Sequence, residues 1–300
     1  MKTNDFIMTA HAVVEKKKGT RSESTLANDI TAIRSLALFL KSHPNQTLLD
    51  EQLLSAYQFW LQQRGICLNT VSCYIRSLRS IYNLLVGNTQ IFSNAFTGGT
   101  RTKKRSLSIE DVKKLKALNL KGMPQLEMAR DLFLFSIYAL GMPFVDMAFL
   151  KKENVKFDSI CYMRHKTRQP VFVPLEPCMK DIIRKYKHSS TVYLFPILTS
   201  TDQPQAYLQY QNRLNSYNRL LKKLSRRAGL SVNLSSYVVR HTWASLAYSS
   251  NIELNVISKA LGHTNTNTTQ IYIRELEDYK LRDANNIVLR AIFSRRKQRH

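Results

Sequence analysis

Residues 237–272 read YVVRHTWASLAYSSNIELNVISKALGHTNTNTTQIY. In this stretch Tyr272 follows His263 by nine positions, and Arg240 lies some twenty positions before the histidine. The pKa of a tyrosine phenol is about 10, so only about one phenol in a thousand is ionised at neutral pH. A tyrosine therefore attacks a phosphodiester only where a base or a strongly positive phosphate site assists it. The arginine and the histidine supply such a site, and the stretch predicts a nucleophilic tyrosine rather than a core tyrosine on an amphipathic helix.

The charge of the whole chain fits a partner that carries phosphate. Lys and Arg number 45 against 21 Asp and Glu, which gives a net charge of +24 over 300 residues. The excess is uneven, since residues 1–100 carry a net charge of +4 and residues 101–300 carry +20. Such an excess favours salt-dependent attraction to a nucleic-acid backbone. The alternative is an ordinary basic protein or one that binds a membrane surface.

The apolar residues do not indicate a membrane protein. The absence of a long uninterrupted apolar run excludes a transmembrane segment, and the N-terminus lacks the hydrophobic stretch of a signal peptide. We therefore expect a cytoplasmic location. The cysteines show no paired metal-ligand spacing, so we expect reduced thiols and no bound metal. These cysteines are Cys67, Cys73, Cys161 and Cys178.

One stretch of the chain has the composition of a linker. Residues 94–105, NAFTGGTRTKKR, contain two glycines, small polar residues and a basic run without apolar periodicity. We therefore predict an N-terminal domain over residues 1–93, a basic linker over residues 94–105 and a second domain over residues 106–300. The linker either follows a phosphate backbone or is a solvated tether. Its candidate DNA-binding residues are Lys103, Lys104 and Arg105.

Apolar periodicity predicts that the first domain is helical. Three stretches have apolar residues on one helical face; they are residues 26–40, 49–61 and 71–85. The third helix is expected to begin near Asn69 and Thr70, which are good N-cap residues. Arg76 and Arg79 fall off its apolar stripe and are expected to point outward. Short helices with outward arginines are typical of a small DNA-binding domain, so both arginines are candidate DNA-binding residues.

The second domain has a mixed pattern. Two β-rich runs surround Lys166 and predict a hairpin with this lysine in its turn. Ser108 precedes a helix whose first turn is acidic, which the helix dipole favours. Further helices are expected over residues 126–140, 179–187, 208–228 and 254–261, and around Arg240 and Tyr272. The expected fold class is therefore mainly α, with a helical N-terminal domain and a mostly helical α/β domain that contains a small antiparallel sheet.

Three motifs follow the hairpin lysine in order. They are YVVRHTWA at residues 237–244, ISKALGH at residues 257–263 and TQIY at residues 269–272. With these motifs in this order and at this spacing, the chain resembles the tyrosine recombinases of the phage integrase family over nearly its whole length. Within that family it is similar to the short integrases and DNA invertases of bacterial mobile elements. The resemblance implies a SAM-like core-binding domain, a catalytic domain and site-specific recombination of DNA.

The resemblance also implies roles for single residues. Tyr272 would form a 3′-phosphotyrosine ester with DNA, Arg240 and His263 would bind the phosphate, and Lys166 would act as the general acid. The ester conserves the energy of the broken linkage, so rejoining is expected to need neither ATP nor any other cofactor. Asp146 matches an acidic position that supports the site in the family.

Two positions depart from the family pattern. Pro143 stands where the family's first arginine lies, two residues after Gly141, and it offers neither charge nor donor. Loss of one preorganised donor typically costs about 10²- to 10³-fold in rate. Tyr237 stands where many members have a histidine, and it can still donate a hydrogen bond to phosphate, whereas His241 is expected to be structural. The candidates to compensate for the lost arginine are Arg168, Arg164 and Arg130.

The resemblance implies partners as well. Residues 279–293 form an amphipathic stretch, and in the family a C-terminal exchange helix docks on a neighbouring protomer; the alternative is packing on its own domain. We expect double-stranded DNA with an inverted-repeat recombination site, bound by a homo-oligomer that is a tetramer on two DNA sites. Only some 20 residues precede the first expected helix, so we expect no separate arm-binding domain.

Two other functions remain open. A DNA-binding, architectural or regulatory protein that has lost catalysis would account for Pro143 and Tyr237. A monomeric topoisomerase would use the same nucleophile, although the helical first domain and residues 279–293 disfavour it. Covalent capture of DNA separates both enzymes from the binding protein, and concentration-dependent synapsis of two sites separates a recombinase from a topoisomerase.

Overall fold

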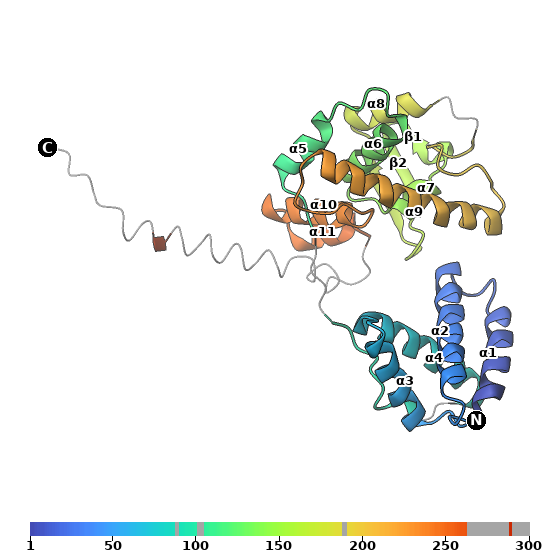
Figure 1. Ribbon diagram of the computed structural model, residues 1–300. Coiled ribbons are helices and arrows are strands. Elements are labelled where there is room, and N and C mark those ends of the chain that lie inside the picture. The colour runs from blue at the N-terminus through green and yellow to red at the C-terminus, as the bar shows by residue number, and fades with distance from the viewer. Residues whose placement is uncertain (88–89, 101–104, 188–190, 263–287, 290–300) are drawn as a thin grey trace. The chain divides into compact units, whose positions relative to one another are not determined.

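The computed structural model describes residues 1–87, 90–100, 105–187, 191–262 and 288–289, which are coloured in Figure 1. The chain divides into two compact units, Met1–Thr102 and Lys103–His300. The division lies inside the stretch that we predict to be a linker. Each unit has a hydrophobic core of its own.

Helices make up the first unit. They are α1 (Thr3–Lys16), α2 (Glu23–Ser42), α3 (Glu51–Gln63) and α4 (Leu68–Val86), followed by a short 3₁₀ helix, η1 (Gln90–Phe92). α2 packs against α4, and α1 packs against both (Figure 1). All four α-helices contribute fully buried side chains to the core, among them Phe6, Leu36, Tyr57 and Ile75.

The expectation that the first helix begins near residue 26 is wrong, because α1 precedes it. α1 buries Phe6, Ala10 and Val14, which recur every four residues along one face. Just after its end, Lys17 forms a buried ion pair with Asp29 of α2, with 3.3 Å between Nζ and Oδ2. α1 is therefore part of the first unit's core. The signal was a narrow stripe of three residues, weaker than the stripes of the other helices.

The expected start of α4 also needs correction. The N-cap of α4 is Cys67, so Asn69 and Thr70 lie within its first turn. Arg76 and Arg79 are exposed on the same helix. They lie on the surface as predicted, and their contact with DNA stays a prediction.

Part of the predicted linker lies against the first unit. Phe96 donates its backbone N–H to Oε1 of Gln58 on α3 at 2.7 Å. Thr100 donates its N–H to Oδ1 of Asn69 at 2.8 Å and accepts from Nδ2 of the same side chain at 3.1 Å. Asn69 thus holds a segment 31 residues away in the chain instead of capping its own helix.

The second unit contains helices and a small sheet. In chain order its elements are α5 (Ile109–Ala117), α6 (Pro124–Tyr138), α7 (Phe144–Ala148), η2 (Lys152–Asn154), β1 (Val155–Lys156), β2 (Ser159–Met163), β3 (Pro170–Pro174), α8 (Pro177–Tyr186), α9 (Gln203–Arg227), α10 (Val238–Ser249) and α11 (Leu254–Ala260). α5 begins after Ser108 as expected, and Ser108 is its N-cap, since its side chain accepts from the N–H of Asp111.

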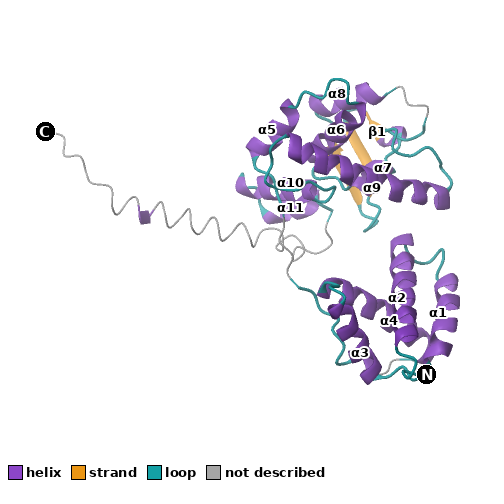
Figure 2. Ribbon diagram, viewed as in Figure 1, coloured by secondary structure: helices purple, strands orange, loops and turns teal. Residues whose placement is uncertain are grey.

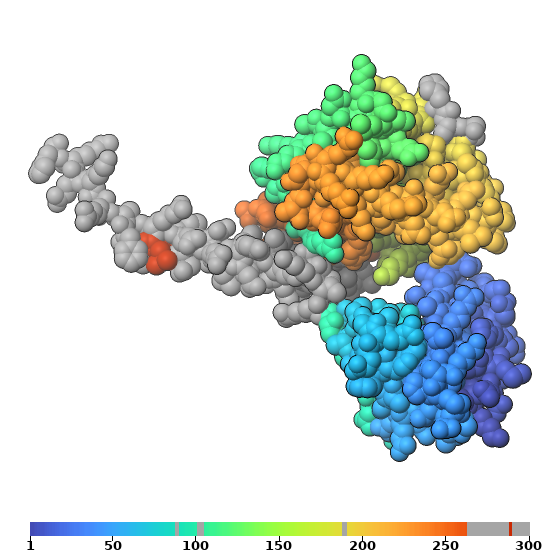
Figure 3. All heavy atoms as spheres, in the orientation of Figure 1, coloured from blue at the N-terminus to red at the C-terminus, as the bar shows by residue number. Residues whose placement is uncertain are grey.

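α6 is the central helix of this unit. It packs against α5, α8, α9 and α10, and residues 131–137 are all buried. A helix that is apolar around most of its circumference has to lie inside a domain, so this position follows from the sequence. α9 lies on the outside, where Figure 3 shows its residues along one face of the second unit.

The sheet is antiparallel, with strand order β1–β2–β3 (Figure 2). The two predicted strands are confirmed, whereas β1 has only two residues and is too short to show an alternating pattern. Met163 of β2 pairs with Pro170 of β3, which places Lys166 in the turn between them.

The mainly helical fold class with a small antiparallel sheet is confirmed. In the described ranges we find no helix with the combination of length and apolar character needed to cross a bilayer. The described side chains also contain no group of three His, Cys, Asp or Glu residues arranged to hold a metal ion.

The position of α1 in the core predicts how shortening one of its buried side chains changes stability. Phe6 is fully buried, whereas Met8 of the same helix is 76% exposed. Phe6→Ala should lower the free energy of unfolding of the first unit by about 3–5 kcal/mol, and Met8→Ala by less than about 0.5 kcal/mol. Urea unfolding followed by Trp60 fluorescence in a Trp243→Phe background reports on this unit alone, because the chain has two tryptophans. Equal, small effects of both changes would contradict the packing of α1.

Candidate active site

Arg240 lies in the first turn of α10 and is only 5% exposed. Its Nη2 donates to the carbonyl oxygen of Leu261, just after α11, and its Nη1 lies 3.5 Å from the carbonyl oxygen of Gly141. Two segments that are distant in sequence therefore meet at this guanidinium. One is the turn after α6, and the other is the Leu261–Gly262 turn that leads to His263.

The turn after α6 approaches α10 very closely. Gly141 has a φ of +70°, and a Cβ atom there would lie 3.2 Å from Cβ of Trp243 and 3.3 Å from Cα of Arg240. Only glycine combines this backbone conformation with this approach. Pro143 follows in the same turn as the N-cap of α7. Pro143, where we expect the first arginine, thus lies in the turn that contacts Arg240, and its side chain carries no donor.

A second buried guanidinium reaches the same place from the sheet. Arg164 directly follows β2 and is 6% exposed. Its Nη1 donates to the carbonyl oxygen of Leu261 and lies 3.4 Å from the carbonyl oxygen of Gly262. Its Nε lies 3.6 Å from Oδ2 of Asp146 on α7. Arg164 and Arg240 therefore meet at one carbonyl oxygen.

Asp146 joins α7 to the hairpin. Its side chain is 1% exposed, and its Oδ1 accepts from the backbone N–H of His165 at 2.8 Å. Burial raises the pKa of the Asp146 carboxyl, while that hydrogen bond and the positive charges of Arg164 and Arg240 lower it. In the described part of the second unit, this is the one buried carboxylate beside two buried guanidiniums. The excess of positive charge suits an anion.

The hairpin turn lies against the end of α11. Arg164 donates its N–H to the carbonyl oxygen of Gln169 at 2.8 Å, and Arg168 donates its N–H to that of Arg164 at 2.9 Å. Oγ1 of Thr167 lies 3.5 Å from the carbonyl oxygen of Gly262. Lys166 is exposed in this turn. The lysine is thus held one residue from a contact with the turn that leads to His263.

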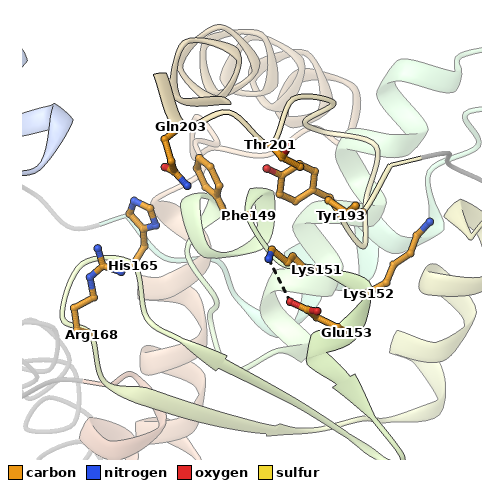
Figure 4. A pocket seen from close by; sticks show the side chains of 10 residues that line it. Phe149, Lys151, Lys152, Glu153, His165, Arg168, Tyr193, Thr201 and Gln203 are labelled. Carbon is orange, nitrogen blue, oxygen red and sulfur yellow. Dashed lines mark ion pairs between the residues drawn. The ribbon is translucent and has the colours of Figure 1, made fainter. Parts of the chain in front are cut away.

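Arg168 and His165 line a separate pocket of about 660 Å³ (Figure 4). The His165 ring stacks on Phe149, with 5.1 Å between ring centroids, and burial lowers the pKa of His165. In Figure 4 Arg168 and His165 lie at one end of this pocket and Lys152 at the other. Arg168 is exposed and has a φ of +55°, a backbone conformation that non-glycine residues rarely adopt. The residue of the hairpin with this conformation therefore lines the pocket.

Arg130 belongs to another charge cluster. Its Nε and Nη2 donate to Oδ1 of Asp131 at 3.1 and 3.0 Å, and its Nη1 donates to the carbonyl oxygen of Leu118 at 2.8 Å. Oδ2 of Asp131 accepts from Lys185 at 2.7 Å and from Tyr186 at 2.9 Å. These contacts tie α6 to α8 and to the end of α5, and none of them involves Arg240.

Tyr237 lies at the N-terminal end of α10 and is 56% exposed. Its ring lies edge-on to the buried ring of His241, with centroids 4.7 Å apart. The tyrosine precedes Arg240 by three residues at the start of the same helix. The packing of His241 agrees with the structural role expected for it.

Several predicted residues lie outside the described residues. They are Tyr272, His263, Lys103 and Lys104. Residues 279–293, apart from residues 288–289, also lie outside the described residues. Arg105 is described and exposed, and its Nη1 lies 3.5 Å from the carbonyl oxygen of Asn233. Of the predicted catalytic residues, Arg240 contacts the turn that precedes His263, and Lys166 lies next to Thr167, which contacts the same turn. Tyr237 lies at the start of the helix that carries Arg240.

A basic surface on α9 was missed by the sequence analysis. Five exposed polar side chains recur at intervals of three and four residues, which puts them on one helical face; they are Asn212, Asn215, Arg219, Lys222 and Arg226. α9 contains no acidic residue, and four members of this α9 stripe line a pocket of about 680 Å³. Its signal was the alternation of asparagine and basic residues on the face opposite Tyr217 and Leu221, which are buried.

Comparison with known proteins agrees with this arrangement. Residues 106–278, more than half of the chain, match the Phage integrase family. Residues 5–103 match the Phage integrase SAM-like domain.

Similar proteins include the tyrosine recombinase XerC of Halalkalibacterium halodurans, which is 26% identical over 93% of this chain and 96% of its own length. The tyrosine recombinase XerD of Oceanobacillus iheyensis is 22% identical over 84% of this chain and 87% of its own. A lambda integrase dimer bound to a core site has a similar fold, with a TM-score of 0.68 at 14% identity over 91% of this chain and 95% of that one. Taken with the match over residues 106–278, the chain belongs to the phage integrase family of tyrosine recombinases.

Proposed function

We propose that this chain is a site-specific DNA recombinase that cleaves and rejoins DNA strands through Tyr272. The observation that carries the proposal is the buried positive cluster at the Leu261–Gly262 turn, one residue before His263. Family membership supplies the reaction class. The cluster supports a phosphate site in this particular chain.

Each step of the reaction has a candidate group. Oη of Tyr272 attacks the scissile phosphorus, so that an O–P bond forms while the bond from phosphorus to the 5′-oxygen breaks. Arg240 and His263 bind the non-bridging oxygens and stabilise the charge that develops on them. Lys166 gives its proton to the departing 5′-oxygen. The reverse attack by a 5′-hydroxyl rejoins a strand without an external energy source.

Tyr237 is proposed to complete the phosphate site. Tyr237 is 56% exposed at the start of α10, and a phenol hydroxyl is a donor that a phosphate oxygen can accept. With a phenol pKa of about 10, it would act as a donor rather than as a base near neutral pH. Donation of a hydrogen bond to phosphate is the role of the family's histidine that a tyrosine can fulfil.

The partner that we propose is double-stranded DNA with an inverted-repeat site, bound by four copies of the chain on two sites. Lambda integrase has been solved as a dimer on a core site and as a tetramer on a Holliday junction, and its fold is shared by this chain. Residues 279–293 would link protomers. Candidate phosphate contacts in and after the first unit are Arg76, Arg79, Lys103, Lys104 and Arg105.

We further propose that the α9 stripe faces the major groove. An α-helix fits this groove, where Asn pairs with adenine and Arg with guanine through two hydrogen bonds each. The stripe offers both residue types at helical spacing with no nearby acid on the same helix. The net charge of +20 over residues 101–300 supports phosphate contacts around it.

A second candidate function is DNA binding without catalysis. Pro143 favours it, because the turn after α6 supplies no arginine to the site. In that case the chain would bind its site and never form a covalent bond to DNA.

Covalent trapping tests the nucleophile. A nicked suicide duplex carrying the inverted repeat beside the gene should form a phosphotyrosyl adduct with the wild type and none with Tyr272→Phe, since only the phenol oxygen is removed. Gel electrophoresis under denaturing conditions measures the adduct. Tight, site-specific binding with no adduct from either protein would favour the binding protein.

A sulfur substrate tests the general acid. Lys166→Ala should slow adduct formation by about 10²- to 10⁴-fold on ordinary DNA. A 5′-bridging sulfur makes the leaving group a thiolate, whose conjugate acid has a pKa near 8.5 and needs no proton from the enzyme. On that substrate Lys166→Ala should approach the wild-type rate. An equal defect on both substrates would show that Lys166 acts elsewhere in the reaction.

Binding measurements test the α9 stripe. Asn215→Ala and Arg219→Ala should each cost about 1–3 kcal/mol in preference for the cognate site. Lys222→Ala should weaken binding to all sequences alike and reduce the slope of log K against log salt by about one. Arg184→Ala, a surface arginine of α8, is the matched control. Unchanged site preference in the first two variants would exclude base recognition by α9.

A further inference from the structure

We propose that Arg164 supplies the second phosphate-binding guanidinium of the active site, in place of the arginine that Pro143 lacks. This inference rests on the proposed function, because it names a residue of the same site. It selects one arginine from the three candidates that the sequence offers.

The meeting point of the guanidiniums carries the proposal. Nη1 of Arg164 and Nη2 of Arg240 donate to the same carbonyl oxygen, that of Leu261. Arg164 directly follows β2, and Arg240 lies in α10, 76 residues further along the chain. A phosphate whose charge grows during the reaction is stabilised best by donors that converge from more than one side. Arg164 has this position relative to Arg240.

The environment of Arg164 supports binding of an anion. Its Nε and the Asp146 Oδ2 are both buried and have no hydrogen-bond partner within the described residues. They lie 3.6 Å apart, so their ion pair is without the two parallel hydrogen bonds that would lock an arginine to a carboxylate. A buried N–H without a partner is costly. A phosphate oxygen would supply an acceptor for this guanidinium.

The other two arginines lie in different surroundings. Arg130 donates three hydrogen bonds to Asp131 and to the carbonyl oxygen of Leu118. Arg168 is exposed and lines the pocket of Figure 4 with His165 and Phe149. Neither has a recorded contact with the Leu261–Gly262 turn among the described residues, whereas Arg164 contacts both of its carbonyl oxygens.

Two neighbours act as positioning residues for Arg164. Oδ2 of Asp146 lies 3.6 Å from Nε of Arg164. Oδ1 of Asp146 accepts a hydrogen bond from the backbone N–H of His165, the next residue in the chain. Gly262, with a φ of +60°, makes room for Arg164, because a Cβ there would lie 3.1 Å from Cδ of this arginine. The side chain is therefore fixed between α7 and the end of α11. Lys166 follows two residues later, so one strand end would carry both a phosphate donor and the general acid.

A charge-neutral substrate separates phosphate binding from a structural role. Replacement of one non-bridging oxygen of the scissile phosphate by a methyl group removes the charge that an arginine would neutralise. On the ordinary phosphodiester, Arg164→Ala should slow single-turnover adduct formation by about 10²- to 10³-fold relative to wild type. On the methylphosphonate the same variant should lose less than about tenfold. Arg164→Lys keeps the charge and loses the planar fork. On the phosphodiester its rate of adduct formation should lie between those of the wild type and of Arg164→Ala.

Controls make each outcome decisive. Arg184→Ala should match wild type on both substrates, and Trp243 fluorescence in a Trp60→Phe background reports whether the second unit is folded. If Arg164→Ala fails to fold, the comparison is made with Arg164→Lys. An equal loss on both substrates, no loss at all, or a charge-selective loss seen only with Arg168→Ala or Arg130→Ala would overturn the inference. Absence of any adduct from the wild type would overturn the proposed function itself.

Discussion

The carbonyl oxygen of Leu261 joins three elements of the second unit, namely β2, α10 and α11. It accepts from Arg240 at the start of α10 and from Arg164 at the end of β2. Through Asp146 the same cluster includes α7. A single peptide group at the end of α11 therefore sets where two buried positive charges lie. The next residue but one in the sequence is His263, a predicted phosphate ligand.

Such a cluster needs backbone segments that come unusually close. Glycines stand at both approaches, Gly141 against Arg240 and Gly262 against Arg164, and both have positive φ. A side chain at Gly141 would meet the backbone of Arg240, and one at Gly262 would meet the side chain of Arg164. Burying two arginines beside one carboxylate costs stability unless an anion or well-placed acceptors balance the charge. In the proposed complex the scissile phosphate would be that anion, which gives the cluster a functional reason.

Sequence patterns predict the elements that have strong apolar periodicity or clear residue signals at their ends. The apolar run of α6, the hairpin around Lys166 and the helix that starts at Ser108 are local features, and each is present. α1 was missed because its stripe holds only three buried residues, and Asn69 was misread as a cap because its partner Thr100 lies far along the chain. The choice among three arginines was out of reach for the same reason. Arg164 and its acceptor at Leu261 are 97 residues apart, and periodicity carries no information on such contacts.

In the proposed complex Arg164 and Arg240 together bind the scissile phosphate. A structure of the chain bound to its recombination site and trapped at the cleavage step would test this arrangement. We expect both guanidiniums within hydrogen-bond distance of the non-bridging oxygens of the phosphate joined to Tyr272. A phosphate bound by Arg240 and some other cation, with Arg164 still on the Leu261 carbonyl and Asp146, would contradict it.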